Sequence, residues 1–471
     1  MNNKKIAHML AVISVMFLAL IVYMTAFDMV HHDKYASDTS TDREKYVRRG
    51  TIYDRNKVVL AESTGELNNQ VRLYPYKNRY AHIIGFKSRR YGVSEIEKRY
   101  NNELMGSSSA PVTGDLVTLY EDIKSMFDKK EEQQGADITL TIDNNLQKVC
   151  YDALGSYKGA IVAMNPKTGE IYAMVSKPDF DPTPDNMEKN YDKITSIDKS
   201  FVRKCTNETY FPGSTFKVIT TAAMIENGMD DFTFDDTGEL TVKIKNYGEG
   251  EGKFLGETNL ETGFKNSSNI YFSEAANELG KDALLNTARD FLFEESIDFD
   301  KLGMAKSKLP AEVASPGDIT NTALGQGDVQ ASPLHLAMIS SAIANDGVMM
   351  QPYVIKQISG AAGFKAKPKE LAVCIKGSTA ERLKELMKLC VSHGTGTAAA
   401  IYGKDVCGKT GTAEVDVERG IAHALFIGFA PYDDPEIAIC VVVENLPHKN
   451  TGGTVAAPIA RKVLQKYFEL K

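Results

Sequence analysis

The feature that most constrains this chain is a long uncharged run near its start. Ile6 to Phe27 spans 22 residues without Asp, Glu, Lys or Arg. As a helix, a run of that length covers the roughly 30 Å of a bilayer's hydrocarbon core. A signal-peptide core is shorter, about 7–15 residues, and precedes a small-residue cleavage site, which is not evident here. The run therefore predicts an uncleaved anchor over residues 1–27, with a cleaved signal peptide as the alternative.

The charges that flank this run predict its orientation. Lys4 and Lys5 precede it and Asp28 follows it. Positively charged flanks tend to remain in the cytoplasm. We therefore expect a single-pass protein of the cell membrane, with a cytoplasmic N-terminus and an extracytoplasmic body.

Composition narrows the function of that body. The chain has 471 residues, 43% of them hydrophobic and 25% charged, and a net charge of −7. This length fits two or three domains, and a mildly acidic chain without a basic block argues against nucleic-acid binding. Six scattered cysteines without a CxxC spacing argue against a zinc site, although one or two disulfides stay open.

A change of pattern near Gly135 predicts a domain boundary. Residues 28–135 combine a polar stretch, short strand-like runs and a linker-like end. Residues 94–104 are expected to form a helix that starts with a Ser94-x-x-Glu97 capping box. The segment 28–135 is therefore predicted to be a small pedestal domain with its linker.

Residues 136–471 have the pattern of a larger α+β domain. Antiparallel strands are predicted for 159–164, 170–175, 423–429 and 436–443, and helices for 146–154, 378–390 and 457–467. Helices that flank an antiparallel sheet define this fold class.

The first chemical signal is Ser214-x-x-Lys217, which follows Pro212-Gly213 at the start of a predicted helix. Residues three apart share one helix face. A lysine whose pKa is lowered by burial or by a nearby cation can take the proton of a serine. The pattern predicts an activated serine nucleophile, although alone it is a weak signal.

Two further motifs follow along the chain. Ser267-x-Asn269 offers a second hydroxyl for proton transfer and an amide that can bind a peptide backbone. Lys409-Thr410-Gly411-Thr412 lies on a strand-like run, where the lysine can bind a carboxylate and Gly411 is expected to let a ligand approach the backbone. Each alone fits a turn or an edge strand, but the three motifs in this order are a strong joint signal.

With these motifs the chain resembles the class B penicillin-binding proteins, monofunctional peptidoglycan D,D-transpeptidases, of the short, elongation-associated type. One departure is Leu425, where the family often has Trp. Seven further motifs carry the resemblance over nearly the whole chain: Arg49-Gly50-x-Ile52-x-Asp54-Arg55, Gly92-x-Ser94-x-x-Glu97, Leu140-Thr141-Ile142-Asp143, Ala163-Met164-Asn165-Pro166-x-Thr168-Gly169, Gly325-Gln326-Gly327, Gly394-Thr395-Gly396-Thr397-Ala398 and His423-Ala424-Leu425-Phe426.

The resemblance implies a serine penicillin-recognising fold and a role for each site residue. Ser214 would attack the D-Ala-D-Ala amide of a stem peptide, Lys217 would take its proton, and Ser267 would relay a proton to the leaving D-Ala. Asn269 would hold the substrate backbone, and Lys409 and Thr410 would face the terminal carboxylate. The N–H groups of Ser214 and Thr412 would form the oxyanion hole. β-Lactams would acylate Ser214, and no metal or organic cofactor is expected.

The resemblance also implies partners. We expect a polytopic membrane glycosyltransferase to polymerise the glycan, because anchor, pedestal and transpeptidase take up the sequence. It would bind the pedestal and a stripe of mostly small residues on the anchor. That stripe consists of Ala7, Ala11, Ser14, Leu18, Ile21 and Thr25.

Several alternatives stay open at this stage. A membrane-anchored β-lactamase, a β-lactam sensor and a D,D-carboxypeptidase share the motifs, and an inactive scaffold of wall synthesis is a further possibility. Stem-peptide chemistry, oligomeric state, and a role in elongation, division or sporulation are not specified by the sequence.

Overall fold

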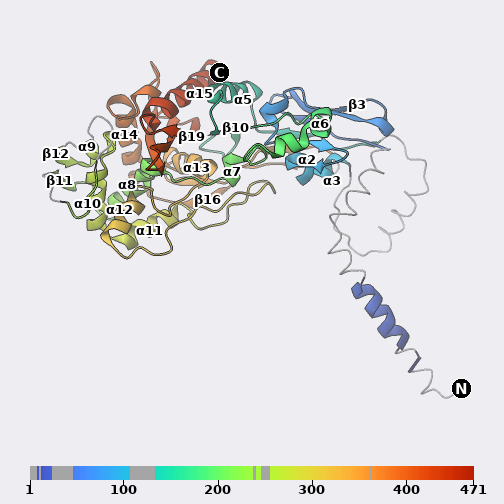
Figure 1. Ribbon diagram of the computed structural model, residues 1–471, viewed down its shortest axis with the longest axis horizontal. Coiled ribbons are helices and arrows are strands. Elements are labelled where there is room, and N and C mark those ends of the chain that lie inside the picture. Colours follow the sequence, from blue (N-terminus) through green and yellow to red (C-terminus); the bar gives the residue numbers. More distant parts are fainter. Residues whose placement is uncertain are drawn as a thin grey trace.

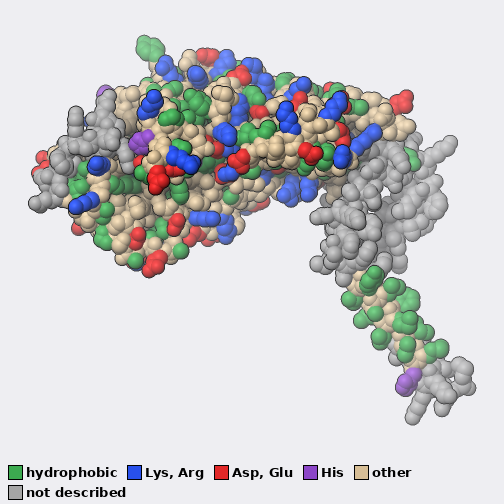
Figure 2. All heavy atoms as spheres, viewed as in Figure 1, with side chains coloured by type: hydrophobic (Ala, Val, Ile, Leu, Met, Phe, Trp, Pro, Cys, Tyr) green, Lys and Arg blue, Asp and Glu red, His purple; other side chains and the backbone are tan. Residues whose placement is uncertain are grey.

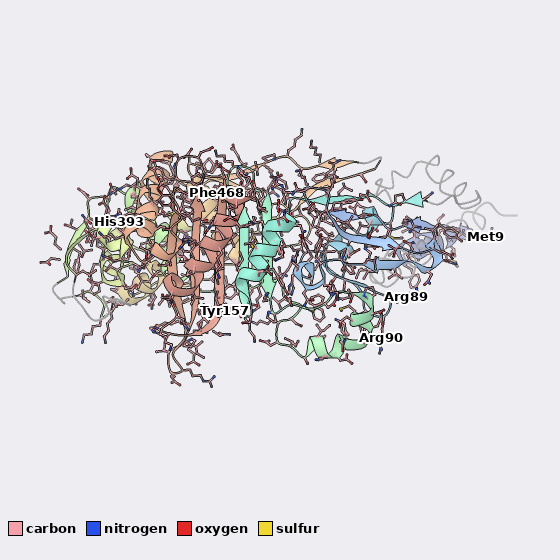
Figure 3. The ribbon with its side chains drawn as sticks, turned by 90° about the horizontal axis from the view of Figure 1, so that it is seen from above. Met9, Arg89, Arg90, Tyr157, His393 and Phe468 are labelled. Atoms are coloured by element: carbon pink, nitrogen blue, oxygen red, sulfur yellow. The ribbon has the colours of Figure 1, made fainter. Side chains whose placement is uncertain are left out.

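The computed structural model describes residues 8–9, 12–23, 46–106, 133–236, 240–245, 255–360 and 363–471. The described residues from 46 onward form an elongated body with a smaller N-terminal lobe and a larger lobe along one axis (Figure 1). Seen from above, Arg90 in the smaller lobe and His393 in the larger lobe lie toward opposite ends (Figure 3).

The larger lobe is built on a five-stranded sheet in the order β10-β9-β19-β18-β17. All of its neighbouring strands pair antiparallel. The strands are β9 (Gly159–Met164), β10 (Ile171–Lys177), β17 (Cys407–Asp416), β18 (Ile421–Ala430) and β19 (Ile437–Pro447). The hairpin and the two late strands predicted from sequence are confirmed, and β17, which carries the Lys409 motif, forms one edge.

Helices cover both faces of this sheet. Ala160 and Val162 of β9 pack into the core that holds the fully buried helix α13 (Pro333–Ala344) and α8 (Lys217–Glu226). Ile161 and Ala163 pack into a second core with α5 (Asn144–Leu154) and α15 (Ala457–Glu469). Because both faces are buried, the strands are apolar along most of their length instead of alternating.

The second sheet has six strands in the order β15-β14-β8-β2-β3-β4. Its strand β8 pairs with β14 on one side and in parallel with β2 on the other. The strands are β2 (Ile52–Tyr53), β3 (Val59–Thr64), β4 (Val71–Leu73), β8 (Ile138–Leu140), β14 (Ile355–Ile358) and β15 (Phe364–Lys365). This sheet therefore joins residues from both sides of the boundary predicted near Gly135.

A second connection between the lobes is the helix α6 (Pro184–Thr195), which lies beside the N-terminal lobe (Figure 1). The rings of Tyr91 and Tyr191 stack there at 3.8 Å between centroids. His82 Nε2 lies 2.7 Å from the carbonyl oxygen of Ser200. The chain after β10 thus packs on the N-terminal lobe before it returns to the larger lobe.

The helix predicted for 94–104 is split into α2 (Glu95–Arg99) and α3 (Asn101–Leu104). The predicted capping box is wrong, because Ser94 makes no side-chain cap and its Oγ accepts from the N–H of Phe86 at 3.0 Å. Glu97 is fully buried and accepts from Arg49 Nε at 2.6 Å and Arg72 Nε at 2.7 Å. The Glu97 carboxylate therefore pairs with two buried guanidinium groups instead of accepting from the backbone N–H of Ser94, as a capping box requires.

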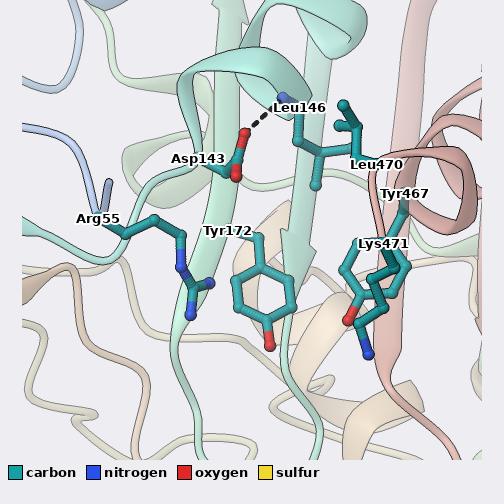
Figure 4. A pocket seen from close by; sticks show the side chains of 7 residues that line it. All are labelled: Arg55, Asp143, Leu146, Tyr172, Tyr467, Leu470 and Lys471. Atoms are coloured by element: carbon teal, nitrogen blue, oxygen red, sulfur yellow. Dashed lines mark hydrogen bonds between the residues drawn. The ribbon is translucent and has the colours of Figure 1, made fainter. Parts of the chain in front are cut away.

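A cavity of about 170 Å³ lies where the C-terminus meets the N-terminal lobe (Figure 4). The Tyr172 and Tyr467 rings stack in its wall at 5.7 Å, and the Arg55 guanidinium lies 4.6 Å from the Tyr172 centroid. Its charged groups have protein partners: Arg55 with Glu170, Asp143 with the N–H of Leu146, and Lys471 with Glu436. These contacts fix the end of α15 against the loop after β2.

The predicted anchor falls only partly within the described residues, since 1–7, 10–11 and 24–27 lie outside them. Residues 12–23 are helical and expose their large apolar side chains (Figure 2). Within the described ranges, no helix has both the length and the apolar character that crossing a membrane requires. The six cysteines are all described, and each is a buried free thiol, so the disulfides left open by the sequence are not formed.

Candidate active site

Ser214 lies on a short 3-10 turn, η3 (Gly213–Phe216), and Lys217 is the first residue of α8. We call η3 the nucleophile turn after the predicted role of Ser214. Gly213 enters it with φ +52°, a value that favours glycine. Its N–H donates to the carbonyl of Gly325 at 2.9 Å, and Thr215 Oγ1 donates to the carbonyl of Pro212 at 2.7 Å. The turn is thus fixed at both ends, with Ser214 partly exposed and Lys217 fully buried.

Lys217 joins the first two motifs. Its Nζ donates to the Ser267 carbonyl and to Asn269 Oδ1, both at 2.7 Å, and lies 3.4 Å from Ser267 Oγ. Ser267 has φ +56° in the turn before α10 (Asn269–Leu279), which Ser268 caps through the N–H of Tyr271. Among the described contacts, no hydrogen bond joins Ser214 Oγ to Lys217 Nζ, as is common before substrate binds.

Lys409 brings in the third motif from the edge strand β17. Its Nζ donates to Ser267 Oγ at 2.7 Å and to the carbonyl of Thr410 at 3.0 Å. The Ser267 hydroxyl therefore lies between the side-chain nitrogens of two lysines. Thr410 Oγ1 in turn lies 2.6 Å from Thr395 Oγ1.

Burial changes the acid–base properties of both lysines. Lys217 and Lys409 are fully buried. Desolvation lowers the pKa of Lys217 well below its ordinary value, and the nearby charge of Lys409 lowers it further. Burial lowers the pKa of Lys409 to about 8. The ammonium form of Lys217 is thus the more disfavoured, which suits a proton acceptor.

Gly411 of β17 lies directly against the turn that carries Ser214. A Cβ added there would lie 2.8 Å from Thr215 Cγ2 and 2.9 Å from the carbonyl oxygen of Pro212. The missing side chain of Gly411 thus makes room for the nucleophile turn, and the approach of a ligand to its backbone stays a prediction.

Thr412 lies on the same stretch of strand, half-buried, and its Oγ1 accepts from the N–H of Gly452 at 3.3 Å. A Cβ on Gly213 would lie 2.7 Å from the carbonyl oxygen of Thr412. The backbone of β17 thus runs directly beside the nucleophile turn.

The structure adds two residues that the sequence left without a role. Thr395 binds Thr410 side chain to side chain, and its N–H donates to the carbonyl of Lys265 at 3.0 Å. Gly325 entered the sequence analysis only as part of a motif, yet its carbonyl accepts from the N–H of Gly213. Thr395 and Gly325 both belong to motifs that carry the resemblance. Their roles could not be predicted, because the sequence does not show that they contact the site. Within the described residues, no group of three or more His, Cys, Asp or Glu could hold a metal ion.

Comparisons with known proteins agree with this geometry. Residues 159–465 match the penicillin binding protein transpeptidase domain, and residues 49–133 match the penicillin binding protein A dimerisation domain. Peptidoglycan D,D-transpeptidase PbpA of Mycobacterium tuberculosis is 30% identical over 96% of this chain and 97% of its own. The PbpA of Mycolicibacterium smegmatis is 28% identical over 98% of both chains.

Solved structures give the same result. Penicillin-binding protein A of M. tuberculosis, as a penicillin G acyl-enzyme complex, superposes with a TM-score of 0.78 at 29% identity over 89% of this chain and 99% of that one. PBP2 of Pseudomonas aeruginosa, in complex with WCK 5153, gives a TM-score of 0.71 at 29% identity over 90% of this chain and 96% of that one.

Proposed function

The chain belongs to the class B penicillin-binding proteins, the peptidoglycan D,D-transpeptidases, and we propose that its reaction passes through an acyl-enzyme on Ser214. The observation that carries this assignment is the Ser267 hydroxyl, which contacts both Lys217 and Lys409. The buried base, the second hydroxyl and the carboxylate-binding cation thereby meet around Lys217, three residues after the partly exposed Ser214.

In the first half-reaction neutral Lys217 takes the Ser214 proton, and Oγ attacks the carbonyl of the penultimate D-Ala. The N–H groups of Ser214 and Thr412 stabilise the oxyanion, a contribution of about 3 kcal/mol per donor. The C–N bond breaks as Ser267 passes its hydroxyl proton to the departing D-Ala amine and takes the Ser214 proton from Lys217 in its place, so that Lys217 is neutral again. Lys409 and Thr410 hold the terminal carboxylate, and Asn269 holds the backbone.

In the second half-reaction the amine of another stem peptide attacks the ester and gives up a proton. The new amide is the cross-link, and Ser214 regains its hydrogen. A β-lactam follows the first half-reaction, but its opened ring stays attached to the ester. No step draws on a metal or an organic cofactor.

Peptide mapping of the penicillin-treated ectodomain tests the nucleophile. We expect the penicilloyl mass on the peptide that contains Ser214, and no fluorescent labelling of Ser214→Ala. The exposed serine variant Ser392→Ala serves as the matched control and should label normally. An adduct on Ser267, or none on folded wild-type protein, would contradict the assignment.

A β-lactamase is the alternative that shares this motif set, and the electrostatics argue against it. Hydrolysis of the penicilloyl ester requires a base that activates water. Among the described residues, no Asp or Glu hydrogen-bonds to Lys217 or Lys409 or shifts the pKa of either. The acyl-enzyme should therefore persist for many minutes, and rapid turnover of a chromogenic cephalosporin would refute this.

The exposed apolar helix at residues 12–23 supports a membrane anchor with the catalytic body outside. Its stripe of small residues and the pedestal are the proposed contacts with a polytopic glycosyltransferase. Cysteine crosslinking tests the stripe: positions 11, 14 and 18 should crosslink to the polymerase, and positions 9, 13 and 16 should not. Uniform or absent crosslinking would remove the stripe as a contact.

A further inference from the structure

A buried carboxylate lies where the chain enters the nucleophile turn. Glu444 Oε1 accepts from Tyr210 Oη at 2.5 Å and forms an ion pair with Lys204 Nζ. The side chains of Glu444 and Lys204 are only 8% and 2% exposed, and Tyr210 is 4% exposed. These three side chains come from two separate segments, since Glu444 belongs to β19 and the other two precede Ser214.

The position of Glu444 is set by an irregularity in the large sheet. The register between β18 and β19 shifts between Ala422 and Ala424, and Asn445 has φ +53°. The N–H of Asn445 donates to His423 Nδ1 at 3.1 Å instead of to a strand carbonyl. A bulge of this kind re-aims the side chains next to it, and the His423 ring packs on Tyr210 with centroids 5.5 Å apart.

Tyr210 is held by both its backbone and its hydroxyl shortly before the nucleophile turn. Its N–H and carbonyl exchange two 2.9 Å hydrogen bonds with Ala331, while its hydroxyl binds Glu444. Four residues later, Ser214 must present its Oγ and its N–H to one carbonyl. A small rotation at Tyr210 is therefore transmitted to both groups, and misplacement of reacting atoms by about 1 Å is costly in rate.

We infer that Glu444 is a positioning residue for the reaction: through Tyr210 it holds the nucleophile turn in register with β17. The inference rests on the proposed role of Ser214. An apolar side chain of similar volume would have a lower desolvation free energy on burial than this ion pair. The same pair supplies a charged acceptor, whose hydrogen bond to Tyr210 is stronger than a neutral one.

Tyr210→Phe tests the inference because it removes one hydroxyl and leaves the ring in place. The matched control is Tyr172→Phe, at the opposite edge of the sheet, where the buried hydroxyl accepts from Asn165 Nδ2 at 2.6 Å. We expect the second-order rate of acylation by a fluorescent penicillin to fall about tenfold in Tyr210→Phe. The pH dependence of that rate should keep its shape, since neither lysine is changed, and Tyr172→Phe should acylate at the wild-type rate.

Glu444→Gln is the second variant, and it stands in if Tyr210→Phe does not fold. It keeps an acceptor for Tyr210 but removes the charge, so the rate should fall less than in Tyr210→Phe. Wild-type acylation rates in Tyr210→Phe or Glu444→Gln, with only a lower Tm, would assign the cluster a purely structural role. If acylation slowed equally in Tyr172→Phe, the cluster would likewise be assigned a purely structural role. Peptide mapping of wild-type protein separates either result from a wrong nucleophile.

Discussion

At the scale of single residues, the two buried lysines predict the pH dependence of acylation. Lys217 must be neutral to take a proton, and burial lowers its pKa, so the rate should rise with pH through that lowered pKa. Lys409 must be charged to bind a carboxylate, and its pKa is about 8, so the second-order rate should fall above about pH 8. Lys409→Arg stays charged in this range, so it should lose the alkaline limb although its maximal rate is lower. An alkaline limb that persists in Lys409→Arg would assign that limb to another group.

A second residue-scale prediction concerns Glu97 in the smaller lobe. Burial alone would raise its pKa, but Arg49 and Arg72 outweigh burial and lower the pKa to about 2. A carboxyl with a lowered pKa adds stability above its unfolded pKa and loses that contribution as pH falls toward 2, here about 3 kcal/mol. Glu97→Gln should lower the Tm strongly at pH 7 and little near pH 2. Glu103→Gln, which breaks the exposed pair with Lys301, should change the Tm slightly. Equal Tm values for Glu97→Gln and wild type at pH 7 would contradict the prediction.

At the scale of elements, the contact between β17 and the nucleophile turn predicts that Gly411→Ala is severely impaired. The added methyl group would meet Thr215 and the Pro212 carbonyl at less than 3 Å, and Gly411 lies in the middle of a paired strand that cannot easily shift. We expect acylation to slow at least about 100-fold while the sheet remains folded. In the control Gly317→Ala the new Cβ would meet nothing closer than 3.6 Å. Circular dichroism shows whether Gly411→Ala is folded, and the acylation rate shows whether its site is impaired. Normal acylation of Gly411→Ala would show that the nucleophile turn can move to accommodate the added methyl group.

The elements also show what a sequence can and cannot predict. Strands β9, β10, β18 and β19 follow from apolar runs bounded by turn residues, because that information is local. The capping box at Ser94 and Glu97 failed because Glu97 binds two arginines far away in sequence. The site motifs were recognised as a set, but the neighbour of Gly411 and the roles of Thr395 and Glu444 depend on contacts across the fold. Such contacts leave no periodic signal in the chain.

At the scale of the whole molecule, the two lobes share structure on both sides of the predicted boundary. Strand β8 lies between β14 and β2, so removing residues 1–135 would expose its pairing edge. Phe180, Met187 and Ile194 would lose Ala81 and Phe86, against which they pack. The segments 28–135 and 136–471 are therefore predicted to depend on each other for folding, although they match two different domain families.

This interdependence gives the last prediction, which compares a fragment of residues 136–471 with residues 28–471, the proposed ectodomain. An unpaired strand edge and the uncovered apolar face of α6 both favour aggregation. The segment between α6 and the nucleophile turn would also lose the pair between Arg203 and Glu95. We expect the fragment to aggregate and to label poorly with fluorescent penicillin, while the ectodomain is monodisperse and labels fully. Size-exclusion chromatography with labelling decides the matter, because a monomeric fragment with the Tm and the labelling of the ectodomain would mean that the larger lobe folds without the smaller one.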